Sequence, residues 1–76
     1  QVTVGVDNPK TEYVTALDLY NDGAHEDAHT LFLKLAQQGN VDAKSMLGVM
    51  YYHGHGTQKN SAKSAVWFYQ AARAGR

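Results

Sequence analysis

Histidine is the residue whose positions in this 76-residue chain first suggest chemistry. Residues 25–29 read His-Glu-Asp-Ala-His, a literal H-E-x-x-H sequence. On a helix this spacing places two imidazoles on one face as zinc ligands, with the glutamate as general base for a metal-bound water. His53 and His55 form a second pair, in a glycine-containing segment, and could hold a metal weakly.

The sequence around these histidines does not complete a metal site. Zinc hydrolysis requires a third protein ligand, but the only acidic residue after the motif is Asp42. We therefore predict no catalytic residue, no metal site and no cofactor, and we expect that the chain is not an enzyme. A metal-binding module that uses His25 and His29 together with the loop imidazoles of His53 and His55 is kept as an alternative.

Composition removes several other classes of function. The chain contains no cysteine, which excludes disulfides, cysteine-ligated zinc and thiol catalysis. Seven Lys and Arg residues balance seven Asp and Glu residues, so the surplus of positive charge that nucleic-acid binding requires is missing. No apolar stretch approaches the roughly 20 residues that span a bilayer. With 43% hydrophobic residues, the chain can still bury a core.

Apolar residues recur at helical spacing in four segments, which breaking or capping residues separate. The sequence therefore predicts four helices of about a dozen residues each, joined by short turns. In chain order, the predicted boundaries are a start at Asn8-Pro9, a break at 21–23, a stop at Gly39, a cap at Asn40, a loop at 53–57, a cap at Asn60 or Ser61, and an end at Gly75.

The same spacing predicts which side chains face the core. Gly48 in mid-helix costs about 1 kcal/mol relative to alanine, so it predicts the close approach of another helix. We expect Trp67 and Tyr51 to fill the space between the helices. Helix by helix, the predicted inward residues are Tyr13, Ala16, Leu17 and Tyr20; Ala28, Leu31, Phe32, Leu35 and Ala36; Ala43, Leu47, Met50 and Tyr51; and Trp67, Phe68, Ala71 and Ala72.

Residues 1–8 stand apart from this helical pattern. Val2, Val4 and Val6 alternate with polar residues, which is a strand period, but one short strand has no partner to pair with. We therefore expect an extended lead-in. The start at Gln1 indicates a processed or cut chain and favours a periplasmic or secreted location.

The two halves of the chain repeat each other. An offset of 31 residues aligns Tyr20 with Tyr51, and an offset of 36 residues aligns Phe32 with Phe68. The same offsets superimpose glycines at helix ends, Gly23 on Gly54 and Gly39 on Gly75. The difference of five residues is the extra length of the second loop. Two copies of a helix-turn-helix unit explain these matches.

The second copy, residues 40–76, follows the pattern Ala-x3-Leu-Gly-x2-Tyr-x2-Gly-x-Gly, then a loop, then Ala-x2-Trp-x3-Ala-Ala-x2-Gly, and departs from it at Ser64. In this it resembles a Sel1-like repeat. The first copy, about 11–39, is divergent, with Leu17 in place of Gly48 and a leucine in place of Trp67. The repeat positions are Ala16, Tyr20, Gly23, Ala36, Gly39, Ala43, Leu47, Gly48, Tyr51, Gly54, Gly56, Trp67, Ala71, Ala72 and Gly75.

This resemblance implies a fold and an architecture. Sel1-like repeats belong to the tetratricopeptide-like α-solenoids, so we expect an all-α superhelix of two antiparallel helix-turn-helix repeats over residues 9–76. Two units are fewer than the three or so usually needed for stability. We therefore expect self-association or continuation into further repeats.

The resemblance also implies a function. Such repeats occur in bacterial secreted and regulatory proteins and in eukaryotic degradation complexes, where the first helix of each unit lines a concave groove. Carried onto this chain, that implies an adaptor or scaffold segment that binds a protein or peptide, with a structural spacer as the alternative. The residues expected to bind the partner are Asp18, Asn21, Ser45, Val49 and Tyr52.

Overall fold

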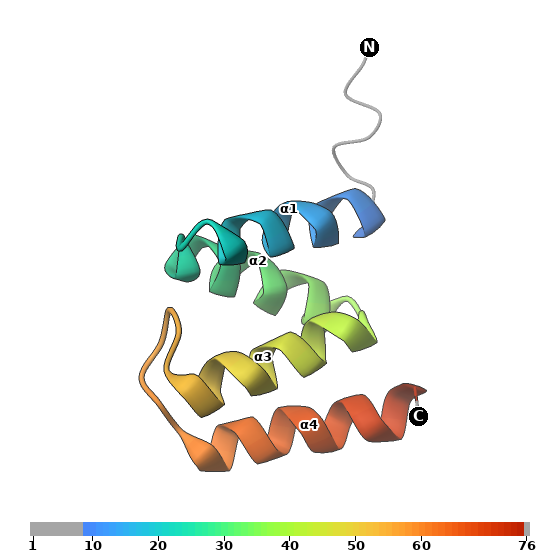
Figure 1. Cartoon of the computed structure of the whole chain (residues 1–76). Helices are drawn as coiled ribbons and strands as arrows, with labels where there is room; N and C mark the ends of the chain where they lie inside the picture. The colour runs from blue at the N-terminus through green and yellow to red at the C-terminus, as the bar shows by residue number, and fades with distance from the viewer. Residues whose placement is uncertain (1–8, 76) are drawn as a thin grey trace.

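Four helices stack in chain order in a computed structural model that describes residues 9–75 (Figure 1). They are α1 (Pro9–Asn21), α2 (His25–Gln37), α3 (Val41–His53) and α4 (Ser61–Gly75). Helix α1 packs against α2, α2 against α3, and α3 against α4. The predicted all-α architecture of two antiparallel helix pairs is confirmed, while the lead-in expected at 1–8 lies outside the described residues.

Asparagine side chains begin two of the helices. The Asn40 carboxamide oxygen accepts a hydrogen bond of 2.9 Å from the Ala43 amide at the start of α3. Asn60 accepts from the Lys63 amide at the same distance, so Asn60, and not Ser61, caps α4. Both bonds satisfy backbone donors that have no partner within a first helical turn.

The core lies between the two central helices. Phe32 and Leu35 of α2 and Leu47 and Met50 of α3 are the largest side chains that the fold buries fully. From α1, Tyr13 contacts the Phe32 ring edge-on, with 5.8 Å between the ring centroids. Helix α1 therefore packs on the α2 side of this core, and α4 packs on its α3 side.

The predicted inward stripe of α4 is wrong at Ala72, while Phe68 faces α3 as predicted but stays partly uncovered. Ala71 is buried and Trp67 is partly buried against the core, as expected for inward residues. Phe68, however, is 41% exposed, and Ala72 is exposed as well. The physical reason is that, within residues 9–75, α4 packs against α3 on one side, so residues at the edge of its stripe stay uncovered.

The close helix contact predicted at Gly48 is present, but a different side chain makes it. A Cβ atom added to Gly48 would lie 2.9 Å from three atoms of the Phe68 ring. Phe68, rather than Trp67 or Tyr51, therefore occupies the space that the missing side chain leaves. Glycine at this position lets α4 approach α3 closely.

Ser64, the one departure from the repeat pattern, is buried in the same contact. Its hydroxyl donates a hydrogen bond of 2.7 Å to the Gly48 carbonyl oxygen, which ties α4 to the middle of α3. We expect Ser64→Ala to lower the free energy of unfolding by about 1 kcal/mol, because a buried hydrogen bond is lost. Urea denaturation measures this change. The exposed Ser61→Ala variant is the control, and equal losses in both variants would contradict the assignment.

Candidate functional site

The five residues expected to bind a partner are distributed over two helices. Asp18 and Asn21 are exposed on α1. On α3, Ser45 and Val49 are half-buried and Tyr52 is 56% exposed, and their spacing places these three on one face of the helix. Among residues 9–75, no hydrogen bond or ring contact joins the α1 pair to the α3 trio.

Three histidine rings stack beside Tyr52 at one end of the bundle. His25 and His55 lie with ring centroids 4.6 Å apart and nearly parallel, and His53 stacks on the other side at 5.3 Å from His55. The Tyr52 ring contacts His53 edge-on at 5.0 Å. We call His25, His55 and His53 the histidine column. It joins the first residue of α2 to the last residue of α3 and the loop that follows, and so it links the two helix pairs.

Tyr20 holds the histidine column from α1. Its hydroxyl lies 2.8 Å from Nδ1 of His55 and donates to that nitrogen when the nitrogen carries no proton. The Tyr20 ring also lies 4.9 Å from the ring of His25. Burial, followed by the positive charges of His25 and His53, lowers the pKa of His55. The geometry therefore favours a neutral His55.

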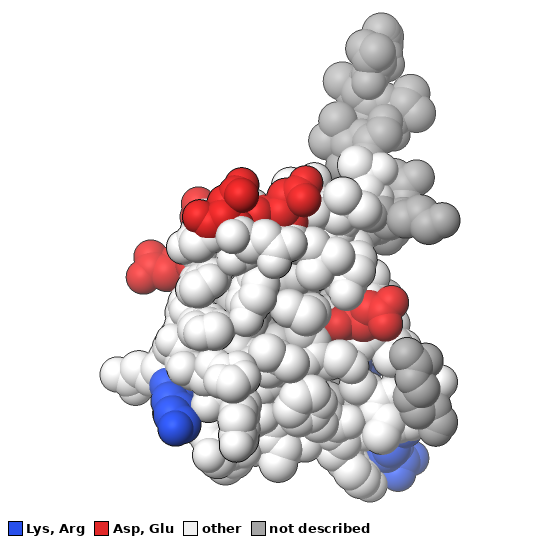
Figure 2. All heavy atoms as spheres, viewed as in Figure 1, with Lys and Arg blue, Asp and Glu red and all other residues white. Residues whose placement is uncertain are grey.

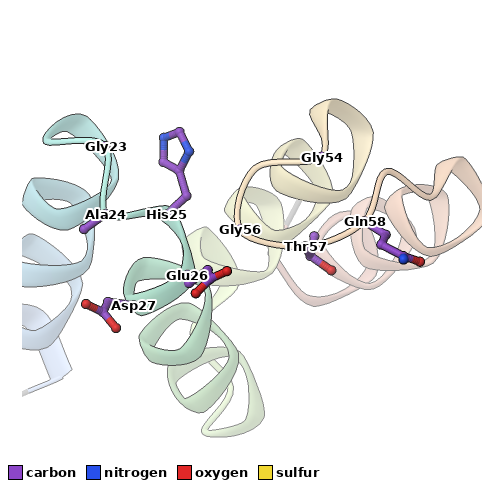
Figure 3. Close-up of a pocket in the computed structure, with 9 residues that line it drawn as sticks. All are labelled: Gly23, Ala24, His25, Glu26, Asp27, Gly54, Gly56, Thr57 and Gln58. Carbon is purple, nitrogen blue, oxygen red and sulfur yellow. The ribbon is translucent and has the colours of Figure 1, made fainter.

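An open cleft of about 650 Å³ lies beside the histidine column, between the first turn of α2 and the α3–α4 loop. Figure 3 shows Gly56 and Thr57 of the loop beside α2, with the Glu26 carboxylate on the side that faces them and Asp27 directed away. The lining residues are Gly23, Ala24, His25, Glu26, Asp27, Gly54, Gly56, Thr57 and Gln58. The cleft is polar and open, so it offers no enclosed apolar pocket for a small molecule.

His29 lies one turn along α2 and has different neighbours. Its ring contacts the edge of Tyr51 at 5.4 Å, and the Lys63 ammonium lies 5.5 Å from the centre of that same tyrosine ring. The Nε2 atom of His29 is buried without a hydrogen-bond partner. Burial first, and the Lys63 charge second, lower the pKa of His29.

The H-E-x-x-H sequence lies on a helix, but its two histidines serve separate packing contacts. His25 stacks in the histidine column, whereas His29 contacts Tyr51. Within residues 9–75 no group of three or more His, Cys, Asp or Glu side chains could hold a metal ion. Stacked rings also direct their in-plane nitrogen lone pairs alongside one another rather than toward one point.

Residues 41–75, which form α3, α4 and the loop between them, match the family described as Sel1 repeat. This helix pair is a Sel1 repeat. Its helices carry the close Gly48–Phe68 contact and the buried Ser64 described above. Sel1 repeats are generally protein–protein interaction modules, and they are typically non-catalytic.

Two curated proteins are similar to part of this chain. The chain is 36% identical over 47 residues to the ERAD-associated E3 ubiquitin-protein ligase component HRD3A of Arabidopsis thaliana. It is 37% identical over 41 residues to HRD3B, a component of the same description from the same plant. The matches cover 62% and 54% of this chain but 7% of each relative's length. No solved structure shows a significant match.

The sequence grouped His25 with His53 and His55 only as possible metal ligands and did not predict that the three rings stack, although one signal for their proximity was present. His25 follows the turn after Tyr20, and His53 and His55 flank the equivalent turn glycine, Gly54. In an antiparallel stack, equivalent turns of successive units lie at the same end of the bundle. The repeat offset therefore placed these imidazoles near each other. What the sequence could not give was the ring stacking itself.

Glycine at position 56 is required for this end of the bundle. Its φ is +75°, and a Cβ atom there would overlap the carbonyl oxygen of His25. We expect Gly56→Ala to destabilise the fold by about 3 kcal/mol, because strained backbone and a backbone clash combine. Gly23→Ala is the matched control, with φ +90° and nothing within 4 Å, and should cost about 1 kcal/mol. Thermal or urea unfolding compares the two variants, and equal losses would show that the loop contact contributes nothing.

Both histidines with lowered pKa values make folding sensitive to acid. An imidazole whose pKa lies below the ordinary 6.5 binds fewer protons when folded than when unfolded, so acidification favours the unfolded chain. We expect stability to be constant above about pH 7 and to fall as the pH drops toward about pH 5. The variant with His29→Leu and His55→Asn should show a flatter profile in urea titrations. An unchanged slope in that variant would contradict the assignment.

Proposed function

We propose that this chain is a non-catalytic adaptor or scaffold segment that binds a protein or peptide through the exposed faces of α1 and α3. The observation that carries the proposal is Tyr52, which is 56% exposed while its ring rests against His53. A large aromatic side chain that is exposed yet held in place loses little conformational freedom on binding. Val49, half-buried on the same face of α3, extends the apolar contact.

The other proposed contacts are polar. Asp18 and Asn21 on α1 and Ser45 on α3 would form hydrogen bonds at the rim of the interface, around Tyr52 and Val49. We infer that the residues of the H-E-x-x-H sequence take no part in catalysis, since ring packing already engages both histidines. No helix within residues 9–75 has the length and apolar character to cross a membrane.

The names of the two similar proteins also support a role in binding a protein partner. Each is named as a component of a ubiquitin-protein ligase, which describes a part of a larger protein assembly. We propose that the repeat contributes to assembly in this chain as well, with a protein partner and without nucleic acid. The balanced charge of the chain supports the last point.

Tyr52→Ala tests the proposed surface. We expect partners captured on the immobilised chain from an extract of its source cells to bind the variant at least about tenfold more weakly, because Tyr52 anchors the contact. Val66→Ala is the control, since Val66 is 53% exposed on α4 and so lies outside the proposed α1 and α3 contacts. Partners that the Tyr52→Ala variant retains as strongly as the control does would refute this surface.

A further inference from the structure

The histidine column lies where the α3–α4 loop meets the first helix pair. Gly56 of this loop packs against the backbone of His25, since a Cβ atom on Gly56 would overlap the His25 carbonyl oxygen. Beside that contact the His25 and His55 rings stack, with 4.6 Å between their centroids. Figure 1 shows the loop as the orange segment at the left of the stack, between α3 and α4. The column is therefore part of the joint between the two helix pairs.

Hydrogen bonds hold the loop mainly to α3. The amides of Gly54, His55 and Asn60 all donate to carbonyl oxygens of α3. Among the described residues, the one hydrogen bond that joins the loop to α1 or α2 is the 2.8 Å contact between the Tyr20 hydroxyl and Nδ1 of His55. Parting the stacked rings would thus free the middle of the loop from α2, while both ends of the loop stay bonded to α3.

The three imidazoles of the column have no carboxylate partner. Within residues 9–75 the one salt bridge joins Lys34 to Glu12, far from the column in the sequence. Tyr20 faces the column from α1 and Tyr52 faces it from α3, so these helices present phenol groups rather than carboxylates.

Other charged residues lie in the turns and the first turn of α2 at this end of the stack. They are Asp22, Glu26, Asp27 and Lys59. Figure 2, viewed as in Figure 1, shows acidic side chains toward α1 and a basic one toward α4 at the left end, with uncharged surface between them. In the cleft, the Glu26 carboxylate is on the side that faces Gly56 and Thr57, and it forms no ion pair with His25 or His55. A charge gained by the column is therefore not neutralised by a direct partner.

The middle ring, His55, decides whether the column stays together. An imidazolium ion stacks favourably on a neutral aromatic ring, so the outer rings can carry protons while His55 is neutral. A proton on His55 would lie between two charged rings, 4.6 Å from one and 5.3 Å from the other, and all three would repel. The Tyr20 hydroxyl would also have to turn its hydrogen away from Nδ1. Burial, and then the positive charges of His25 and His53, lowers the pKa of His55, which reflects the same conflict.

We propose that the histidine column is a pH-sensitive switch between the two helix pairs, closed while His55 is neutral and opened when His55 binds a proton. Opening separates His55 from His25 and releases the middle of the loop from α2, while the four helices keep their places. The open cleft of about 650 Å³ beside the column gives the rings room to part. The change is local, unlike the loss of global stability predicted above, and it does not depend on the proposed binding surface.

NMR spectroscopy of the isotope-labelled full chain tests the switch without any partner. We expect nuclear Overhauser effects between the ring protons of His25 and His55 at about pH 8, and their loss at about pH 5. The core contact between the Tyr13 and Phe32 rings should give its own effect at both pH values. The loss should follow the titration of the His55 ring protons, with a midpoint below the ordinary histidine value of 6.5.

Two matched variants on α2 separate charge from packing. His25→Phe and His29→Phe each replace a half-buried imidazole by a phenyl ring, but His29 lies outside the column, against Tyr51. In His25→Phe a protonated His55 has one charged neighbour fewer, so the rings at positions 25 and 55 should stay in contact at about pH 5. His29→Phe should open as the parent does. His53→Phe, at an exposed position, removes the other neighbouring charge and should move the opening to lower pH as well.

Three results would overturn the proposal. The first is a contact between the His25 and His55 rings that persists in the parent after His55 has titrated. The second is loss of the Tyr13–Phe32 contact together with the column, because the change would then be global unfolding. The third is opening at the parent's pH in both His25→Phe and His53→Phe, which would show that the neighbouring charges play no part.

Discussion

The contact between α2 and α3 is the interaction on which the rest of the molecule depends. Every large side chain that the fold buries fully lies in these two helices, and burying each one contributes about 1.5–3 kcal/mol. Helices α1 and α4 each pack against one member of this pair. Their positions, and those of the loops at their ends, follow from the central contact. The same contact joins the α1–α2 pair to the α3–α4 pair.

Much of this arrangement follows from the sequence. Asn40 and Asn60 marked helix starts because a short carboxamide satisfies free backbone amides. Gly48 marked a close approach because nothing else justifies glycine in mid-helix. Periodicity could not say how much of each stripe a neighbouring helix covers, and for that reason it did not show that Ala72 is exposed or that Phe68, although packed on Gly48, is 41% exposed. A stripe of apolar residues identifies a face that packs, but whether both edges of it are covered depends on tertiary structure.

The sequence predicts some features of the candidate site and not others. The exposed positions of Asp18, Asn21 and Tyr52 follow from helical spacing relative to the core stripes. The ring stacking of His25, His55 and His53 depends on side-chain rotamers and on the path of the loop after α3, neither of which the spacing specifies. A sequence shared with zinc hydrolases thus serves packing between the α1–α2 pair and the α3–α4 pair. The lesson is physical: ligand spacing along one helix has meaning only when a second element completes the coordination shell.

Packing in chain order has a further consequence for local unfolding. Each helix is held by its immediate neighbours, so an outer helix can detach while the central pair persists, as in other linear repeat arrays. Amide hydrogen exchange would then be graded along the stack, slowest in the middle and fastest at the two ends. Anything that docks on α4 would therefore slow exchange of the helix it touches. Contact on the outer side of α4 and the order of α4 itself would then be coupled parts of one equilibrium.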